Sequence, residues 1–169
     1  MKRVLALLAA LVALLFAAAS DLRTQSSPAT EMEFAQFLVG TWNCSHTVGD
    51  FSGTYTTTVE NALNGRWLHQ TYDFPNLGDK TGAVHAEYFI GYDPRVSKWV
   101  RFGAMSDGQY FAMRSTRSGN SWTWSYVLPG QSGSAVYTKR SNTEFTVDGP
   151  TYPENGKMVT EHHTCRKSS

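Results

Sequence analysis

The sequence predicts an all-β fold, a single antiparallel up-and-down barrel of about ten strands with a short N-terminal helix. From residue 41 onward, short stretches rich in strand-forming residues follow one another, separated by turn residues. They do not alternate with long helices, which excludes a parallel α/β sheet. Turns between consecutive strands favour a barrel. The alternative is a two-sheet sandwich, which usually needs a longer crossover.

The first 19 residues have the pattern of a signal peptide, residues 1–19. Lys2 and Arg3 precede an uninterrupted apolar run, Val4 to Phe16, and small residues allow cleavage before Ser20. The alternative is a membrane helix, but the run is shorter than the roughly 20 residues that a span needs. We therefore expect an exported protein, periplasmic or extracellular, with no membrane span after cleavage.

The next segment, residues 20–30, is polar and small in character and predicts a flexible linker. A short helix follows at 31–39, with Thr30 as its cap and Glu33 completing a capping box. The barrel domain is expected to cover residues 31–166, leaving 167–169 as a tail. One face of the helix carries three apolar side chains: Phe34, Phe37 and Leu38.

Turn residues separate the predicted strands. Asn64 and Gly65 are typical of a type I′ hairpin, and residues 75–82 are expected to form a loop. Pro150 and Pro153 predict a second loop, before the last strand. The predicted strands are 41–48, 54–63, 66–74, 84–92, 98–105, 109–117, 121–128, 133–140, 144–148 and 157–166.

The two cysteines lie on the first and last predicted strands. In a closed barrel these strands are neighbours, so Cys44 and Cys165 are expected to form a disulfide in an exported protein. The bond would close a loop of about 120 residues and add up to ~4–5 kcal/mol in the chain-entropy model. The alternative is two buried free thiols.

The composition bounds the partners. The chain has 15 Lys and Arg against 14 Asp and Glu and no basic stripe, so we expect no nucleic-acid partner. Aromatic residues make up 13% of the chain and charged residues only 17%, so much aromatic surface must be buried in a core or in a pocket.

Several sequence blocks resemble a known family. Through Leu38 to Trp42, Leu63 to Leu68, Phe89 to Pro94 and Lys98 to Val100, the chain is similar to lipocalin-like, calycin-type barrels. It resembles most closely a bacterial exported family of unknown function that is built on that barrel. The resemblance implies fold rather than chemistry.

The resemblance also assigns a place to the first tryptophan. It implies that Trp42 seals the barrel floor and that a basic residue, Arg166 or Arg140, stacks on it. Haem barrels that handle nitric oxide are more distant relatives, but their glycine-rich opening is missing after Trp42. No cofactor is therefore expected.

Aromatic and methionine side chains are dense on three consecutive predicted strands between residues 98 and 128. An eight- to ten-stranded barrel is wide enough for one small ligand, and such cavities have apolar walls with few polar groups. Arg101 or Arg114 would bind a carboxylate or phosphate head group. The alternative is that the aromatics fill the barrel and the arginines reach solvent. The predicted ligand-binding residues are Trp99, Arg101, Met105, Tyr110, Met113, Arg114, Trp122, Trp124 and Tyr126.

Other chemistry has little support in the sequence. The histidines do not follow a metal-binding motif, although His85 and Glu87 are spaced to share a strand face, and a serine-hydrolase elbow is missing. We expect no metal. The leading function is binding of a small apolar or amphipathic molecule. The alternatives are an isomerase- or cyclase-type barrel enzyme, in which Arg101 or a histidine polarises the substrate, and a solid-core structural or interaction module.

Overall fold

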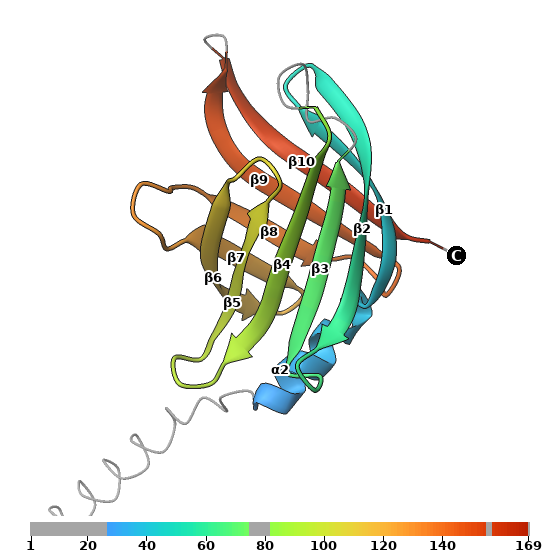
Figure 1. Cartoon of the computed structure of the whole chain (residues 1–169), viewed down its shortest axis with the longest axis vertical. Helices are drawn as coiled ribbons and strands as arrows, with labels where there is room; N and C mark the ends of the chain where they lie inside the picture. Colours follow the sequence, from blue (N-terminus) through green and yellow to red (C-terminus); the bar gives the residue numbers. More distant parts are fainter. Residues whose placement is uncertain (1–26, 75–81, 155–156, 169) are drawn as a thin grey trace, which may run out of the picture.

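Ten antiparallel strands close into one barrel (Figure 1). The computed structural model describes residues 27–74, 82–154 and 157–168. Each strand pairs with its neighbours in sequence, and the last strand pairs with the first, which closes the barrel. This confirms the predicted up-and-down barrel with one short N-terminal helix. The predicted signal peptide, most of the linker and most of the loop at 75–82 lie outside the described residues.

The strand bounds agree closely with the predicted ranges, except at the ninth strand. They are β1 Gly40–Val48, β2 Phe51–Ala62, β3 Trp67–Phe74, β4 Val84–Asp93, β5 Lys98–Met105, β6 Tyr110–Ser118, β7 Ser121–Tyr126, β8 Ser134–Lys139, β9 Glu144–Glu154 and β10 Lys157–Lys167.

The ninth strand continues through both prolines that the sequence assigned to a loop, so that prediction is wrong. β8 pairs with β9 only as far as Asp148, and beyond this point β9 pairs with β10 alone. Proline is tolerated in such an edge segment because one side of the strand has no ladder of hydrogen bonds to break. Pro150 and Pro153 both lie in this segment, which extends past β8 in Figure 1.

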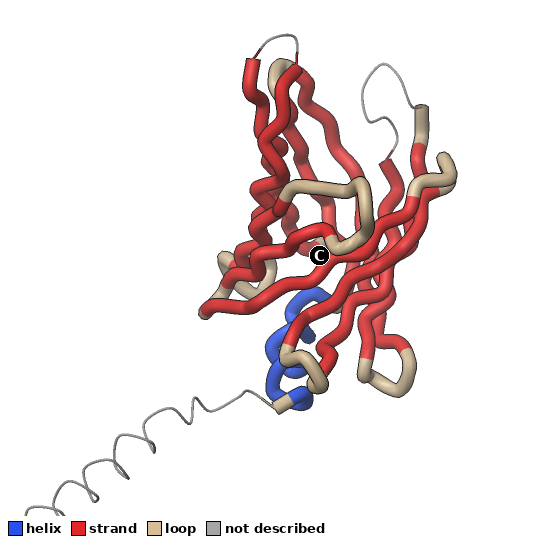
Figure 2. Tube along the Cα trace, turned by 90° about the vertical axis from the view of Figure 1, so that its left-hand side faces the viewer, coloured by secondary structure: helices blue, strands red, loops and turns tan. Residues whose placement is uncertain are grey.

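The helix lies against one end of the barrel, which we call the floor (Figure 2). Helix α2, Pro28–Ala35, continues into the 3₁₀ turn Gln36–Leu38. Its cap is Ser27, whose hydroxyl accepts a hydrogen bond from the Thr30 N–H at 3.1 Å, so the predicted cap at Thr30 is wrong. Pro28 explains the earlier start, because its missing N–H costs nothing in a first turn.

The floor is sealed by Trp42, which is fully buried. Its indole N–H donates to the Leu38 carbonyl oxygen at 2.7 Å. The cation over its ring is Lys167, at 5.2 Å, and not Arg166 or Arg140 as expected. Lys167 lies directly opposite Trp42 in the β1–β10 ladder and therefore shares its face, whereas the neighbouring Arg166 points outward and pairs with Glu144.

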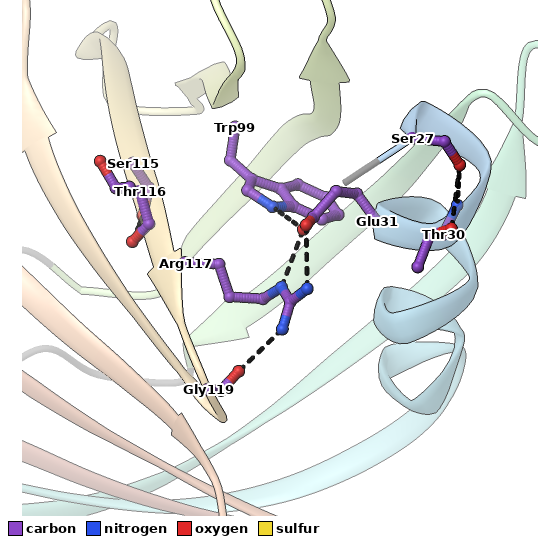
Figure 3. A network of polar contacts seen from close by, with 8 residues as sticks. All are labelled: Ser27, Thr30, Glu31, Trp99, Ser115, Thr116, Arg117 and Gly119. Carbon is purple, nitrogen blue, oxygen red and sulfur yellow. Dashed lines mark hydrogen bonds and ion pairs between the residues drawn. The ribbon is translucent and has the colours of Figure 1, made fainter. Parts of the chain in front are cut away.

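A buried ion pair fastens the helix to the barrel (Figure 3). The Glu31 carboxylate accepts hydrogen bonds from the Arg117 guanidinium at 2.8 and 2.9 Å and from the Trp99 indole at 2.9 Å. The Arg117 guanidinium also lies 4.3 Å from the centre of the Phe34 ring. These contacts tie α2 to β5 and β6.

A search of the described helices for a membrane span finds none that has the necessary length and apolar character.

The closure seam carries the predicted disulfide. Cys44 and Cys165 face each other in the β1–β10 ladder, with their Cα atoms 4.0 Å apart, and the two sulfur atoms are bonded. The bond joins residues 121 positions apart in the chain. It therefore links the two strands whose pairing closes the barrel, which confirms the sequence prediction.

Candidate functional site

Most of the predicted ligand-binding residues lie on the inner face of the barrel. Arg101 of β5 pairs directly with Met113 of β6, which pairs with Tyr126 of β7, so the three side chains share one face. Because side chains alternate along a strand, every second residue before and after these three points to the same face. The predicted residues on this inner face are Trp99, Arg101, Met105, Met113, Trp122, Trp124 and Tyr126.

Two predicted residues are not in this group. Tyr110 is 67% exposed and Arg114 is exposed, because they alternate with the inward-facing Phe111 and Met113 on β6. Arg114 instead borders an outer cleft of about 930 Å³, together with Arg66. This placement corrects the predicted set at Tyr110 and Arg114 and leaves Arg101 as the charged member of that set on the inner face.

The Arg101 guanidinium lies in a cage of aromatic side chains from four other strands. Only 6% of the residue is exposed. One terminal nitrogen donates to the Tyr72 hydroxyl at 3.0 Å, and the other donates to the Tyr137 hydroxyl. The rings of Tyr88 and Phe111 lie 4.5 and 5.4 Å from the guanidinium carbon. The cage therefore satisfies the cation with phenol oxygens and ring faces.

A glycine makes room for the nearest ring. Gly103 lies opposite Tyr88 in the β4–β5 ladder. A side chain at position 103 would collide with the Glu87 carbonyl oxygen and with the Tyr88 ring. The glycine thus lets Tyr88 lie close to β5, where its ring reaches the guanidinium of Arg101 two residues away.

No acidic side chain among the described residues forms an ion pair with Arg101. Other arginines differ: Arg117 pairs with Glu31, Arg95 with Asp93 and Arg166 with Glu144. Burial acts to lower the pKa of Arg101, but Tyr137, Tyr72 and Tyr88 raise it, and the net pKa lies above the ordinary value. The barrel therefore holds a permanent positive charge that no acidic side chain of the described residues pairs with.

Tyr72 and Tyr88 of the cage remain protonated. Burial raises the pKa of Tyr88 to about 12 and raises the pKa of Tyr72 well above its ordinary value. Arg101 acts in the opposite direction on both groups, but burial is the larger effect. These phenols are therefore hydrogen-bonding groups rather than bases at physiological pH.

The interior differs above and below Arg101. Between Arg101 and the floor, the cavity measures only about 20 Å³, so the lower half of the barrel is a packed core. On the other side, toward the end away from α2, four inward-facing apolar side chains are half-buried: Phe74, Met105, Phe111 and Tyr126. A ligand of drug-like size needs roughly 300 Å³ or more, so the cavity below Arg101 cannot hold one.

A second polar group lines the wall near the disulfide. The His46 and His163 rings stack with their centres 5.0 Å apart, and His163 Nδ1 lies 3.0 Å from the Tyr55 hydroxyl. Burial first, and His163 second, lower the pKa of His46.

His85 and Glu87, by contrast, lie on the outer face of the barrel, with His85 Nε2 3.5 Å from Glu87 Oε1. Within the described residues no cluster of three or more His, Cys, Asp or Glu side chains could hold a metal.

Sequence reasoning missed the tyrosines that surround Arg101: Tyr72, Tyr88 and Tyr137. They come from β3, β4 and β8, whereas the predicted wall was limited to three consecutive strands. Their parity was visible in the sequence, but which parity faces inward depends on the register between strands. Only the ladder pairs fix that register.

No protein-family model matches the chain, and no curated protein matches it significantly. Among solved structures, the chain is similar to a redesigned β-barrel, b11L5F_LGL, with a TM-score of 0.44 and 13% identity, over 80% of this chain and 95% of that one. It is also similar to EF1p2_mFAP2b bound to DFHBI, with a TM-score of 0.32 and 17% identity, over 81% of this chain and 98% of that one.

Proposed function

We propose that the protein is an exported, non-catalytic binder of a small amphipathic anion, whose acidic head group pairs with Arg101 inside the barrel. The observation that carries the proposal is the buried Arg101 guanidinium, which has no acidic partner among the described residues. Burying an unpaired charge costs on the order of several kcal/mol. A carboxylate brought by a ligand would compensate this charge.

The hydrogen-bonding capacity of Arg101 supports the same proposal. A guanidinium has five N–H groups, and hydrogen bonds to Tyr72 and Tyr137 engage one on each terminal nitrogen. The second N–H group of each terminal nitrogen is then available to a carboxylate or phosphate. Such pairs are often bidentate and are roughly twice as strong as hydrogen bonds between neutral groups.

The wall above Arg101 suits the rest of an amphipathic molecule. Phe74, Met105, Phe111 and Tyr126 face inward there and are only half-buried. An apolar tail that covered them would remove their remaining surface from water, which is favourable by about 25 cal/mol per Å². The tail belongs on this side because the cavity below Arg101 is too small for it.

The same groups favour binding over catalysis. A general acid or base works best when its pKa lies near the operating pH. Burial instead raises the pKa values of Tyr72 and Tyr88 away from neutrality. A solid-core module has no need of a buried charge, and no acidic side chain of the described residues pairs with Arg101, so this residue also favours the binder over that alternative.

Export and family membership form part of the proposal. We propose that the chain is a lipocalin-like barrel whose signal peptide is removed before Ser20, and that it works in the periplasm or outside the cell. Intact-mass measurement of the protein recovered from the periplasm or medium of its host tests this directly. A mass that includes residues 1–19 would contradict it.

The binding proposal is tested with a matched pair of probes, dodecanoate and dodecanol, which differ in the charged head group. Calorimetry on the wild-type protein is expected to give at least tenfold tighter binding of dodecanoate. Arg101→Gln should remove that preference, whereas Arg114→Gln, on the outer face, should keep it. Equal affinities of the two probes for the wild type, or loss of the preference in Arg114→Gln alone, would contradict the proposal. Circular dichroism of each variant checks that the barrel is folded.

A further inference from the structure

Three buried side chains in the lower barrel carry polar atoms without a hydrogen-bond partner among the described residues. They are Gln70 Oε1, Arg101 Nε and Trp122 Nε1. The three residues are 2%, 6% and 3% exposed, respectively. A buried polar group without a partner is costly, and native proteins pair nearly all such groups with protein atoms or with ordered water.

All three residues line the same cavity. It measures about 20 Å³ and lies between Arg101 and the floor. A cavity needs about 10–15 Å³ on this measure to hold one water molecule, so this one has room for one and not for a larger molecule. The remaining lining is apolar or aromatic: Leu38, Ile90, Trp99, Trp124, Phe145 and the ring of Tyr137.

The hydrogen bonds around Gln70 fix which of its amide atoms is unpaired. The Thr57 hydroxyl donates to the Thr71 carbonyl oxygen at 2.7 Å, so its hydrogen is already engaged. It can therefore only accept from Gln70, whose Nε2 lies 3.1 Å away. This leaves the amide oxygen of Gln70 as the atom that needs a donor.

We infer that one buried water molecule binds between Arg101, Trp122 and Gln70. The N–H groups of Arg101 and Trp122 can only donate, and the Gln70 oxygen can only accept. A water molecule accepts from both donors with its two lone pairs and donates one O–H to Gln70. A halide would suit the two donors but would face the amide oxygen, and a metal cation would face the guanidinium.

This water has a consequence for Arg101. It engages Nε, while the hydroxyls of Tyr72 and Tyr137 accept hydrogen bonds from the two terminal nitrogens. The guanidinium plane is then fixed by three separate groups. The inference is independent of the proposed ligand, because the water lies in the small cavity below Arg101 whether or not a ligand binds above it.

A crystal structure of the wild-type protein at about 1.5 Å resolution, from crystals soaked in sodium bromide, tests the site. We expect one spherical density peak at hydrogen-bond distance, about 2.7–3.2 Å, from Gln70 Oε1, Arg101 Nε and Trp122 Nε1, without anomalous signal. An anomalous bromide peak there, or an absence of density, would overturn the inference.

Proton NMR gives a second test in solution, with controls inside the same molecule. The indole hydrogen of Trp122 should show a direct cross-relaxation peak to water with the sign of a bound molecule. The indole groups of Trp42 and Trp99 donate to the Leu38 carbonyl oxygen and the Glu31 carboxylate and should lack this peak. The inference is wrong if Trp122 behaves like these two controls.

Discussion

Arg101 and Glu31 are both buried charges, but the protein treats them differently. Glu31 is met by Arg117 and Trp99, so its charge is fully compensated within the fold. Arg101 is met by phenols and ring faces, and no carboxylate pairs with it in the described part of the chain. The first arrangement stabilises the attachment of a helix, and the second is the one that the proposed ligand would complete.

The ion pair between Glu31 and Arg117 is expected to contribute measurably to stability. Glu31→Gln keeps the size of the side chain but leaves Arg117 without its counter-charge. Removing one partner of a buried pair usually destabilises by about 3–5 kcal/mol, and we expect the lower end because Arg117 is partly exposed. Urea denaturation measures the change. The control Glu144→Gln, from the exposed pair with Arg166, should cost less than about 1 kcal/mol. Equal effects would contradict the role of Glu31.

Two histidines on opposite faces of the wall are predicted to have pKa values shifted in opposite directions. A hydrogen bond to Asp73 raises the pKa of His85, whereas burial lowers the pKa of His46. The contribution of His85 to stability is therefore complete below pH 6.5 and is lost as the pH rises through its raised pKa. The contribution of His46 is complete above pH 6.5 and is lost as the pH falls through its lowered pKa.

An NMR titration of the ring signals measures both values in one sample. We expect the midpoint of His85 above the ordinary value of 6.5 and the midpoint of His46 below it. Asp73→Asn should bring the midpoint of His85 down and leave that of His46 unchanged. A midpoint of His46 above that of His85 would show that the assignment of the inner and outer faces is wrong.

At the scale of elements, the sequence predicted nearly every strand because turn chemistry and alternation are local signals. Asn64 and Gly65 take positive φ values of 59° and 73°, as the hairpin signal requires. The errors occur where tertiary pairing overrides local preference. Pro150 and Pro153 are tolerated in a segment that is paired on one edge only, and the sequence does not say that β8 stops before them.

The start of helix α2 gives an element-scale prediction. Ser27→Ala removes the hydroxyl that accepts from the Thr30 N–H, so it should destabilise by about 1 kcal/mol, the usual cost of a lost N-cap. Thr30→Ala removes only a side-chain contact to Ser27 and should cost clearly less. Thermal denaturation of both variants checks the order. A larger loss of stability in Thr30→Ala would show that Thr30, and not Ser27, is the cap.

At the scale of the whole molecule, closure depends on the pairing of the two strands farthest apart in the chain. The Cys44–Cys165 bond spans 121 positions and lies on that seam. We predict that the double variant Cys44→Ser/Cys165→Ser is less stable by about 2–5 kcal/mol. Wild-type protein treated with a reductant should melt at the temperature of the variant. A variant that melts together with the oxidised wild type would contradict the role of the bond.

The inner face of the barrel was predictable in part, because the alternation of side chains is a local signal. Parity and aromatic density pointed to Trp99, Arg101 and Trp124, which all face inward. The choice between Arg101 and Arg114 could not be made from the sequence, because each directly follows an apolar residue on its strand. The presence of Tyr72 and Tyr137 beside Arg101 follows only from the closure of the barrel, which brings β3 and β8 around β5.

The central claim is that Arg101 binds the head group of an amphipathic anion within the barrel. The most direct measurement is a crystal structure of the protein with dodecanoate. We predict that the carboxylate lies at hydrogen-bond distance from the terminal nitrogens of Arg101, with the tail along Phe111 and Tyr126. A carboxylate bound only in the outer cleft beside Arg66 and Arg114, or an interior without ligand at saturating dodecanoate, would contradict the claim.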